Sequence, residues 1–155
     1  MSLVPLPRLR KIVSRLKKKR KKIVFTNGCF DLLHTGHIAL LRKAKALGDV
    51  LIVGLNTDRS VRNLKGKGRP VILQKDRALV LSALRDVDFV VFFSDPTPLN
   101  LIRSLTPDVL AKGADYRNSA IVGGDWVRSN GGRVVRIPLV KGRSSSIIFR
   151  KLKQL

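Results

Sequence analysis

Both histidines of the chain lie in one short segment, residues 26–37, which reads TNGCFDLLHTGH. His34 and His37 are three residues apart, so they share a face if a helix begins here. Gly36 removes a side chain where a ligand could approach the backbone. Free amides at a helix start favour a phosphate, and two imidazoles could donate to it. The spacing fits two unrelated surface histidines, or a metal pair without a third ligand, equally well.

A second group of polar side chains stands near the end of the chain. Ser144, Ser145 and Ser146 precede an apolar pattern that predicts a last helix over 144–152. Serine hydroxyls and free amides at a helix start can bind a phosphate, or they can simply cap the helix. Capping is the plainer interpretation of this segment taken alone.

Five apolar runs rich in β-branched residues predict buried strands, and helical patterns separate them. Runs that are apolar at nearly every position are typical of a parallel sheet covered on both faces. The order therefore predicts an α/β fold, a single doubly wound domain with a parallel five-stranded sheet. The expected strands are 23–26, 50–55, 89–93, 109–111 and 134–137, and the expected helices are about 37–47, 58–64, 76–86, 97–105, 120–130 and 144–152.

In doubly wound sheets, ligands bind beyond the carboxyl ends of the strands, where the strand order reverses. The first strand is commonly beside this point, so the segment after Thr26 is the expected site. Asn56 and Asp58 follow the second strand, and Lys112 and Asp115 follow the fourth, at the same edge. For Asp58, an N-cap of the next helix is an equally good interpretation.

The chain has 155 residues, with 32 Lys and Arg against 10 Asp and Glu, and its formal net charge is +22. Hydrophobic residues make up 44%, which excludes a disordered basic tail and predicts one folded domain. Such a charge attracts nucleic acids, anionic membrane surfaces and small phosphorylated substrates, and the charge alone does not choose among them.

A basic amphipathic helix is expected within residues 1–22, ahead of a domain over 23–155. We expect its apolar face to pack on the domain and its cations to face the solvent. A nucleic-acid-binding module is the alternative to an enzyme, although no aromatic platform accompanies the basic run. The apolar positions of this helix are Leu9, Ile12, Val13 and Leu16.

Cys29 is the single cysteine, which excludes a disulfide framework and a multi-cysteine zinc site. The longest apolar runs, 50–55 and 89–93, are far shorter than the stretch of about 20 residues that crosses a bilayer. These features favour a cytoplasmic protein without a membrane partner.

The motif TNGCFD at 26–31, followed by HTGH at 34–37, resembles the signature of the cytidylyltransferase-like nucleotidyltransferases. Four further segments resemble, in order, the heptose 1-phosphate adenylyltransferase branch of that superfamily. The resemblance covers about residues 23–152. The four segments are LNTD at 55–58, LKG at 64–66 with RP at 69–70, KGADY at 112–116, and GRSSSII at 142–148.

The resemblance implies a Rossmann-like nucleotidyltransferase fold that transfers AMP from ATP to D-glycero-β-D-manno-heptose 1-phosphate, giving ADP-heptose and pyrophosphate, a step toward lipopolysaccharide. A phosphate monoester is already largely ionised near neutral pH, so this acceptor needs no general base. Catalysis would be positional and electrostatic, with Mg²⁺ as the cofactor. ATP, a sugar 1-phosphate and a second copy in a homodimer are the implied partners.

Two other activities of the superfamily share the His-x-Gly-His and terminal hydroxyl elements. They are glycerol-3-phosphate cytidylyltransferase and FMN adenylyltransferase. The heptose branch is favoured over both by the LKG, RP and KG segments and by the Asn56-x-Asp58 pattern. The family usually has Ser-Thr-Thr where this chain has three serines. The cations expected to be merely solvated include Lys67, Arg69, Arg103 and Arg143.

The resemblance also implies roles for single residues, and no residue is expected to ligate a metal. For Phe30, core packing is preferred, and for Asp31, bracing of the loop is as good an interpretation as a ligand contact. His34, His37 and Lys65 would be catalytic; Thr26, Asn27, Gly28, Phe30, Gly36, Arg77, Ser144, Ser145 and Ser146 would contact the nucleotide or its phosphates; and Asp31, Asn56, Asp58, Lys112 and Asp115 would contact the acceptor.

Overall fold

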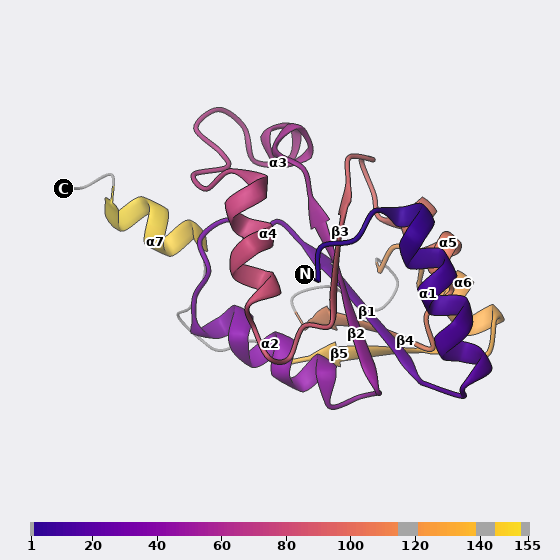
Figure 1. The fold of residues 1–155 in the computed structure, drawn as a ribbon. Helices are drawn as coiled ribbons and strands as arrows, with labels where there is room; N and C mark the ends of the chain where they lie inside the picture. Colours follow the sequence, from indigo (N-terminus) through magenta and orange to yellow (C-terminus); the bar gives the residue numbers. More distant parts are fainter. Residues whose placement is uncertain (1, 115–120, 139–144, 153–155) are drawn as a thin grey trace.

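A computed structural model describes residues 2–114, 121–138 and 145–152, without the side chains of residues 146 and 152. Five parallel strands form one sheet in the order β3-β2-β1-β4-β5 (Figure 1). This order confirms the predicted doubly wound α/β fold. The strands are β1 (Ile23–Gly28), β2 (Val50–Asn56), β3 (Phe89–Phe93), β4 (Val109–Gly113) and β5 (Arg133–Ile137).

Seven helices are found in the described residues, each close to an expected range. The second begins earlier than predicted because His34 caps it, and the third is capped by Thr57, one residue before the expected cap at Asp58. The helices are α1 (Leu6–Lys18), α2 (Thr35–Lys45), α3 (Asp58–Lys65), α4 (Gln74–Ser82), α5 (Leu99–Leu105), α6 (Gly124–Ser129) and α7 (Ser145–Leu152).

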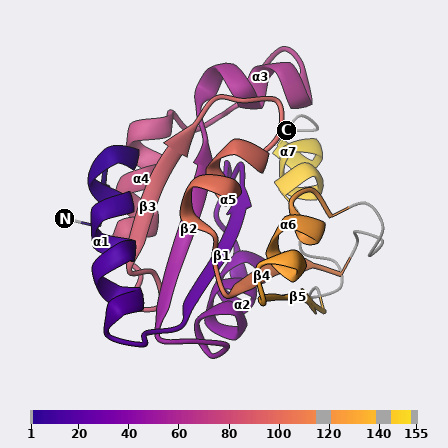
Figure 2. The ribbon, with the colours of Figure 1, turned by 90° about the vertical axis from the view of Figure 1, so that its right-hand side faces the viewer.

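The sheet is covered on both faces, as the apolar strands predicted. Figures 1 and 2 show α2 and α4 on one face and α1, α5 and α6 on the other. Along β1 the side chains alternate between the two cores, since Ile23 and Phe25 pack with α1 and α5, whereas Val24 packs with α2 and α4. Burial on both sides leaves ligands only the ends of the strands.

The N-terminal helix belongs to the core of the domain. Leu9 is 0% exposed and Val13 is also buried, in the same core as β1 and α5, while the neighbouring cations face the solvent. Just before the helix, the Val4 amide donates to the carbonyl of Val90 in β3, and the Val90 amide donates to the carbonyl of Ser2. The expected packing of the apolar face is therefore confirmed. Nucleic-acid binding by the outward cations stays a prediction.

The strand order reverses beside β1, and the pairing of β1 with β4 ends there before the pairing of β1 with β2. The ladder between β1 and β4 ends at the pair Phe25 and Leu110, whereas the ladder between β1 and β2 continues to Gly28. The last residues of β1 consequently lie at the switch point, which is the expected place for a ligand.

None of the helices in the described ranges has the length and apolar character needed to cross a membrane.

Truncation of Leu9 tests the integration of α1 into the core. Leu9→Ala leaves a cavity beneath the sheet and should lower the free energy of unfolding by about 2–5 kcal/mol in urea denaturation. Lys11→Ala, on the exposed side of the same helix, should change it by less than about 0.5 kcal/mol. Equal effects of the two variants would contradict this packing.

Candidate functional site

The first turn of α2 is built around an imidazole. His34 is the N-cap in an extended conformation, and its Nδ1 accepts a hydrogen bond from the amide of Gly36 at 3.1 Å. Because Nδ1 accepts, the neutral ring must carry its proton on Nε2. One hydrogen bond thus fixes both the start of the helix and the tautomer of His34.

His37 stacks on His34. Their ring centroids are 3.9 Å apart with an angle of 25° between the planes, and the ring of Phe30 lies 5.0 Å away on another side of His37. The Nδ1 atom of His37 is buried and has no hydrogen-bond partner. Since buried polar atoms are normally paired, this nitrogen is one of the few exceptions among the described residues.

The surroundings of His37 keep it neutral. Burial, the adjacent His34 and the Lys65 ammonium lower the pKa of His37 to about 4. At pH 7 the ring is therefore an uncharged donor and acceptor. Lys65, at the end of α3, therefore acts on His37 electrostatically, and its expected catalytic role stays a prediction.

More unpartnered polar atoms lie at the end of β1. Thr26 is 0% exposed and its Oγ1 has no hydrogen-bond partner. The Oδ1 of Asn27 is also buried without a hydrogen-bond partner. Lys112, at the end of β4, extends across the switch point and donates from Nζ to the carbonyl of Asn27 at 3.4 Å. Residues of β1 and β4 that are far apart in the sequence therefore meet here, as expected.

The loop between β1 and α2 is held in an unusual shape. Phe30 adopts a left-handed conformation with φ of 44°, and its ring is buried in the core under His37. A Cβ on Gly28 would lie 3.1 Å from that ring, so glycine is required for this close approach. Core packing of Phe30, the preferred interpretation, is confirmed, and the expected contact of Phe30 with the nucleotide stays a prediction.

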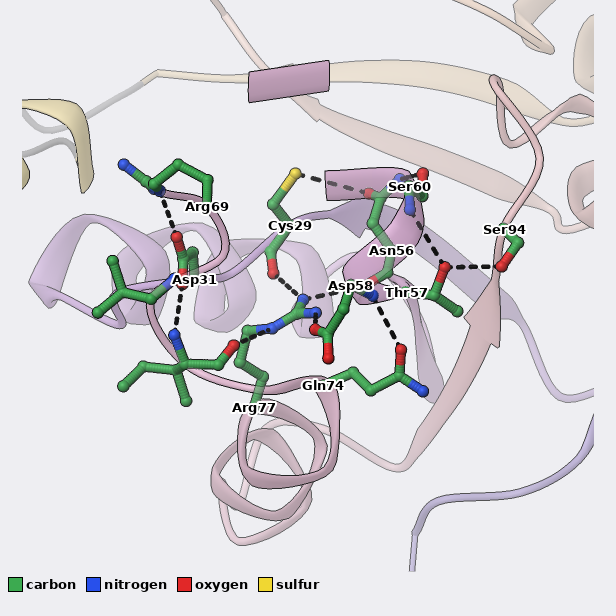
Figure 3. A network of polar contacts seen from close by, with 12 residues as sticks. Cys29, Asp31, Asn56, Thr57, Asp58, Ser60, Arg69, Gln74, Arg77 and Ser94 are labelled. Atoms are coloured by element: carbon green, nitrogen blue, oxygen red, sulfur yellow. Dashed lines mark hydrogen bonds and ion pairs between the residues drawn. The ribbon is translucent and has the colours of Figure 1, made fainter. Parts of the chain in front are cut away.

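Asp31 braces the loop rather than facing a ligand. Its buried carboxylate accepts hydrogen bonds from the backbone amides of Val71 and Ile72 at 2.7 and 2.9 Å, and it pairs with the guanidinium of Arg69 (Figure 3). Both oxygens are engaged, so the expected contact of Asp31 with the acceptor is replaced by a structural contact to the loop before α4.

Arg77 occupies a different place from the predicted one. The expectation was a cation that reaches a phosphate, but the side chain is 2% exposed and lies beneath the loop. Its guanidinium donates to the carbonyls of Cys29, Asn56 and Ile72 and to the carboxylate of Asp58 (Figure 3). All its nitrogens are thereby used within the protein, and Arg77 supports the site from below.

The polar residues after β2 are also engaged with the protein. The Asn56 side chain donates to Ser60 at 2.8 Å, and Asp58 forms an ion pair with Arg77 at 2.7 Å (Figure 3). The cap of α3 comes from Thr57, whose hydroxyl accepts from the amide of Ser60. Asn56 and Asp58 therefore shape this edge of the site, while their expected contact with the acceptor stays a prediction.

The last helix lies against the histidine loop. The Ser145 hydroxyl donates to the carbonyl of Leu32 at 3.2 Å, two residues before His34. The start of α7 is thus beside the start of α2, although more than one hundred residues separate them in the sequence. Ser144 and Asp115 lie outside the described residues, as does the side chain of Ser146, so their expected roles stay predictions.

Sequence reasoning missed two residues of the site. Arg69 was expected to be a solvated cation, yet it is 6% exposed, pairs with Asp31 and lies 4.8 Å above the ring of Phe149. The Cys29 thiol approaches the side-chain oxygen of Asn56 at 3.9 Å, and burial raises its pKa against the opposing charges of Lys65 and Arg77. For Arg69, the feature of the sequence that could have indicated a role in the site was its position in the RP motif.

The cytidylyltransferase-like family model matches residues 25–149, which include every described residue of the site except the end of α7. The chain belongs to the cytidylyltransferase-like family. The family expected from the HTGH motif is therefore confirmed, and the motif maps onto the stacked histidine pair.

Individual relatives of this cytidylyltransferase-like chain agree with that membership. It is 55% identical over 140 residues to the bifunctional protein HldE of Magnetococcus marinus, which covers 90% of this chain and 29% of that protein. The chain thus spans about three tenths of the length of this curated relative. The chain is also 51% identical over 152 residues to the bifunctional protein HldE of Gluconobacter oxydans.

A solved structure extends the likeness. The lipopolysaccharide core biosynthesis protein of Thermoplasma volcanium has a TM-score of 0.65 at 28% sequence identity, over 79% of this chain and 99% of that one.

Titration of His37 tests the electrostatics of the site. The pKa of His37 is about 4 in the folded chain and 6.5 in the unfolded chain. The stability contributed by neutral His37 is therefore fully present above pH 6.5 and is lost as the pH falls from 6.5 toward about 4. Ring resonances followed by NMR should give a pKa near 4. A midpoint at 6.5 for this ring would contradict the buried, stacked arrangement.

Proposed function

We propose that the chain transfers AMP from ATP to D-glycero-β-D-manno-heptose 1-phosphate, forming ADP-heptose and pyrophosphate. The stacked pair of His34 and His37 at the start of α2, in which the surroundings of His37 keep that ring neutral, carries the proposal. Supporting it are the family membership, the bifunctional HldE relatives and the likeness to a lipopolysaccharide core biosynthesis protein. The LKG and RP motifs favour this acceptor within the superfamily.

The start of α2 provides the binding site for the triphosphate. The helix dipole at this end attracts negative charge, and the Lys65 ammonium adds a full positive charge nearby. The buried atoms without a partner in Thr26 and His37 belong to the strand before this helix and to its first turn. Lys112, across the switch point, is suitably placed for the acceptor side of the site.

The reaction follows from the charges of the two substrates. An oxygen of the sugar phosphate attacks the α-phosphorus and forms the new P–O bond, while the bond from the α-phosphorus to the bridging oxygen breaks and pyrophosphate leaves with that electron pair. The attacking oxygen is already ionised, so no proton is removed. The protein must therefore align the substrates and stabilise the negative charge that develops.

Imidazoles that are held in fixed orientations suit this task. The Nε2 of His34 bears its proton because Nδ1 is occupied by Gly36, so its donor direction is fixed before substrate arrives. His37 is held by the stacked ring and by Phe30. Donors that are fixed in advance need little reorganisation in the transition state, which is the main source of electrostatic catalysis.

The proposed reaction uses Mg²⁺, which would enter the site bound to the nucleotide. The carboxylates of Asp31 and Asp58 are already paired with arginines, and the described part of the chain holds no group of three His, Cys, Asp or Glu side chains arranged for a metal. Mg²⁺ commonly binds substrate phosphates and keeps several waters. We therefore assign the ion to the phosphates of ATP, where it would offset their charge.

The remaining expectations concern location and assembly. Use of ATP and a single cysteine favour a cytoplasmic enzyme. A homodimer is proposed from the resemblance alone, and light scattering coupled to size-exclusion chromatography would measure it.

An assay of pyrophosphate release tests the reaction and both substrates. Purified chain is offered ATP or CTP with heptose 1-phosphate, glycerol 3-phosphate or FMN, with and without Mg²⁺. Release should be fastest with ATP and heptose 1-phosphate and should stop when EDTA removes the metal. Turnover of CTP with glycerol 3-phosphate, without turnover of the heptose pair, would overturn the assignment.

Substitution of the histidines separates catalysis from folding. His37→Ala should lower kcat by about 10²–10³-fold, the usual cost of one transition-state donor. His34→Asn retains a side chain that can cap α2 but loses the Nε2 donor, so it should lower kcat similarly with little change in melting temperature. Lys43→Ala, elsewhere on α2, is the matched control and should remain active. Wild-type kcat in both histidine variants would refute the mechanism.

A further inference from the structure

The contacts of Arg69 join three parts of the chain that no local pattern connects. Its guanidinium pairs with Asp31 in the loop after β1, and its other side faces the ring of Phe149 on α7 at 4.8 Å. The loop that carries Arg69 also approaches this helix, since a Cβ on Gly68 would lie 3.9 Å from the same ring. Figure 3 shows Arg69 directly above Asp31.

Phe149 and Ser145 are four residues apart on α7, so they lie on one face in successive turns. Ser145 donates to Leu32 in the histidine loop, and Phe149 meets Arg69. The same face of α7 is therefore fastened at two points, and both points lead to the segment between β1 and α2. The Ser145 contact alone is one neutral hydrogen bond, which contributes little.

The chemistry of Arg69 is poorly explained by stability alone. Asp31 already accepts two backbone amides at 2.7 and 2.9 Å, so its carboxylate is partly satisfied without the arginine. The Nη2 atom of Arg69 is buried without a hydrogen-bond partner, which is unfavourable. A planar guanidinium, unlike an ammonium, can pair with a carboxylate at its edge and stack on an aromatic ring with its face.

We propose that Arg69 is a positioning residue that clamps α7 onto the histidine loop through Asp31 and Phe149. The clamp keeps the first turn of α7, with Ser145, beside the start of α2. Resting on the proposed function, a second consequence follows: the clamp sets how tightly the two helix starts together hold the phosphates of ATP. Loss of the clamp would weaken binding of the nucleotide more than it slows the chemical step.

Hydrogen exchange of the protein without substrates tests the clamp itself. In Arg69→Met, and independently in Phe149→Leu, the amides of residues 148–152 should exchange at least tenfold faster, while those of β1 and β2 keep their wild-type rates. Lys67→Met removes an exposed cation from the same loop and is the matched control, with no change expected in α7. Arg69→Lys retains the charge but not the planar face, so it should also release α7.

Three results would overturn the inference. Unchanged exchange of α7 in both Arg69→Met and Phe149→Leu would show that the contact holds nothing. Faster exchange throughout β1 and β2 would make Arg69 an ordinary stabilising residue of the whole domain. Wild-type protection of α7 in Arg69→Lys would remove the stacking from the explanation.

Steady-state kinetics test the second consequence. Arg69→Met and Phe149→Leu should raise KM for ATP about tenfold or more while kcat at saturating ATP stays within about twofold. An equal loss in kcat without a change in KM would contradict it. If the wild-type chain turns over no nucleotide, the proposed function fails, and the exchange experiment still decides the clamp.

Discussion

The buried guanidinium of Arg77 is the interaction on which the rest of the site depends. A charge removed from water is tolerated only when it is paired and fully hydrogen-bonded. Arg77 meets this condition by binding carbonyls of the β1–α2 loop, of the end of β2 and of the segment before α4, together with the Asp58 carboxylate. One side chain of α4 therefore fixes the relative positions of the segments that surround the histidines.

The second brace, between Asp31 and Arg69, acts on the same loop from the other side. With Asp31 and Asp58 both paired with arginines, the described site presents the positive end of a helix dipole, hydroxyls, two imidazoles and the Lys65 ammonium. The carboxylates thus organise the loop without adding free negative charge near the phosphates. This division explains how a loop that contains Asp31 can still favour a polyanion.

Local patterns predicted the fold well because strands buried on both faces need apolar residues throughout, and β3 was predicted at its observed bounds. They also located the histidine loop, because the first strand of such sheets commonly ends at the switch point. They could not place Arg69 or Arg77. Among 32 cations, the direction of a long side chain depends on distant partners such as Cys29 and Phe149, which composition and spacing do not reveal. The cap of α3 was misplaced by one residue because Thr57 and Asp58 both suit that role.

His34, the residue that caps α2, has two roles at once. Serine, threonine, asparagine and aspartate cap helices well, but their short side chains end where the capping bond is made. Histidine uses one ring nitrogen for the cap and keeps a second on the far side of the ring. Position 34 therefore has almost no acceptable replacement among the twenty amino acids: a shorter residue keeps the helix and loses the outward proton, and a longer cation offers a proton without accepting the amide.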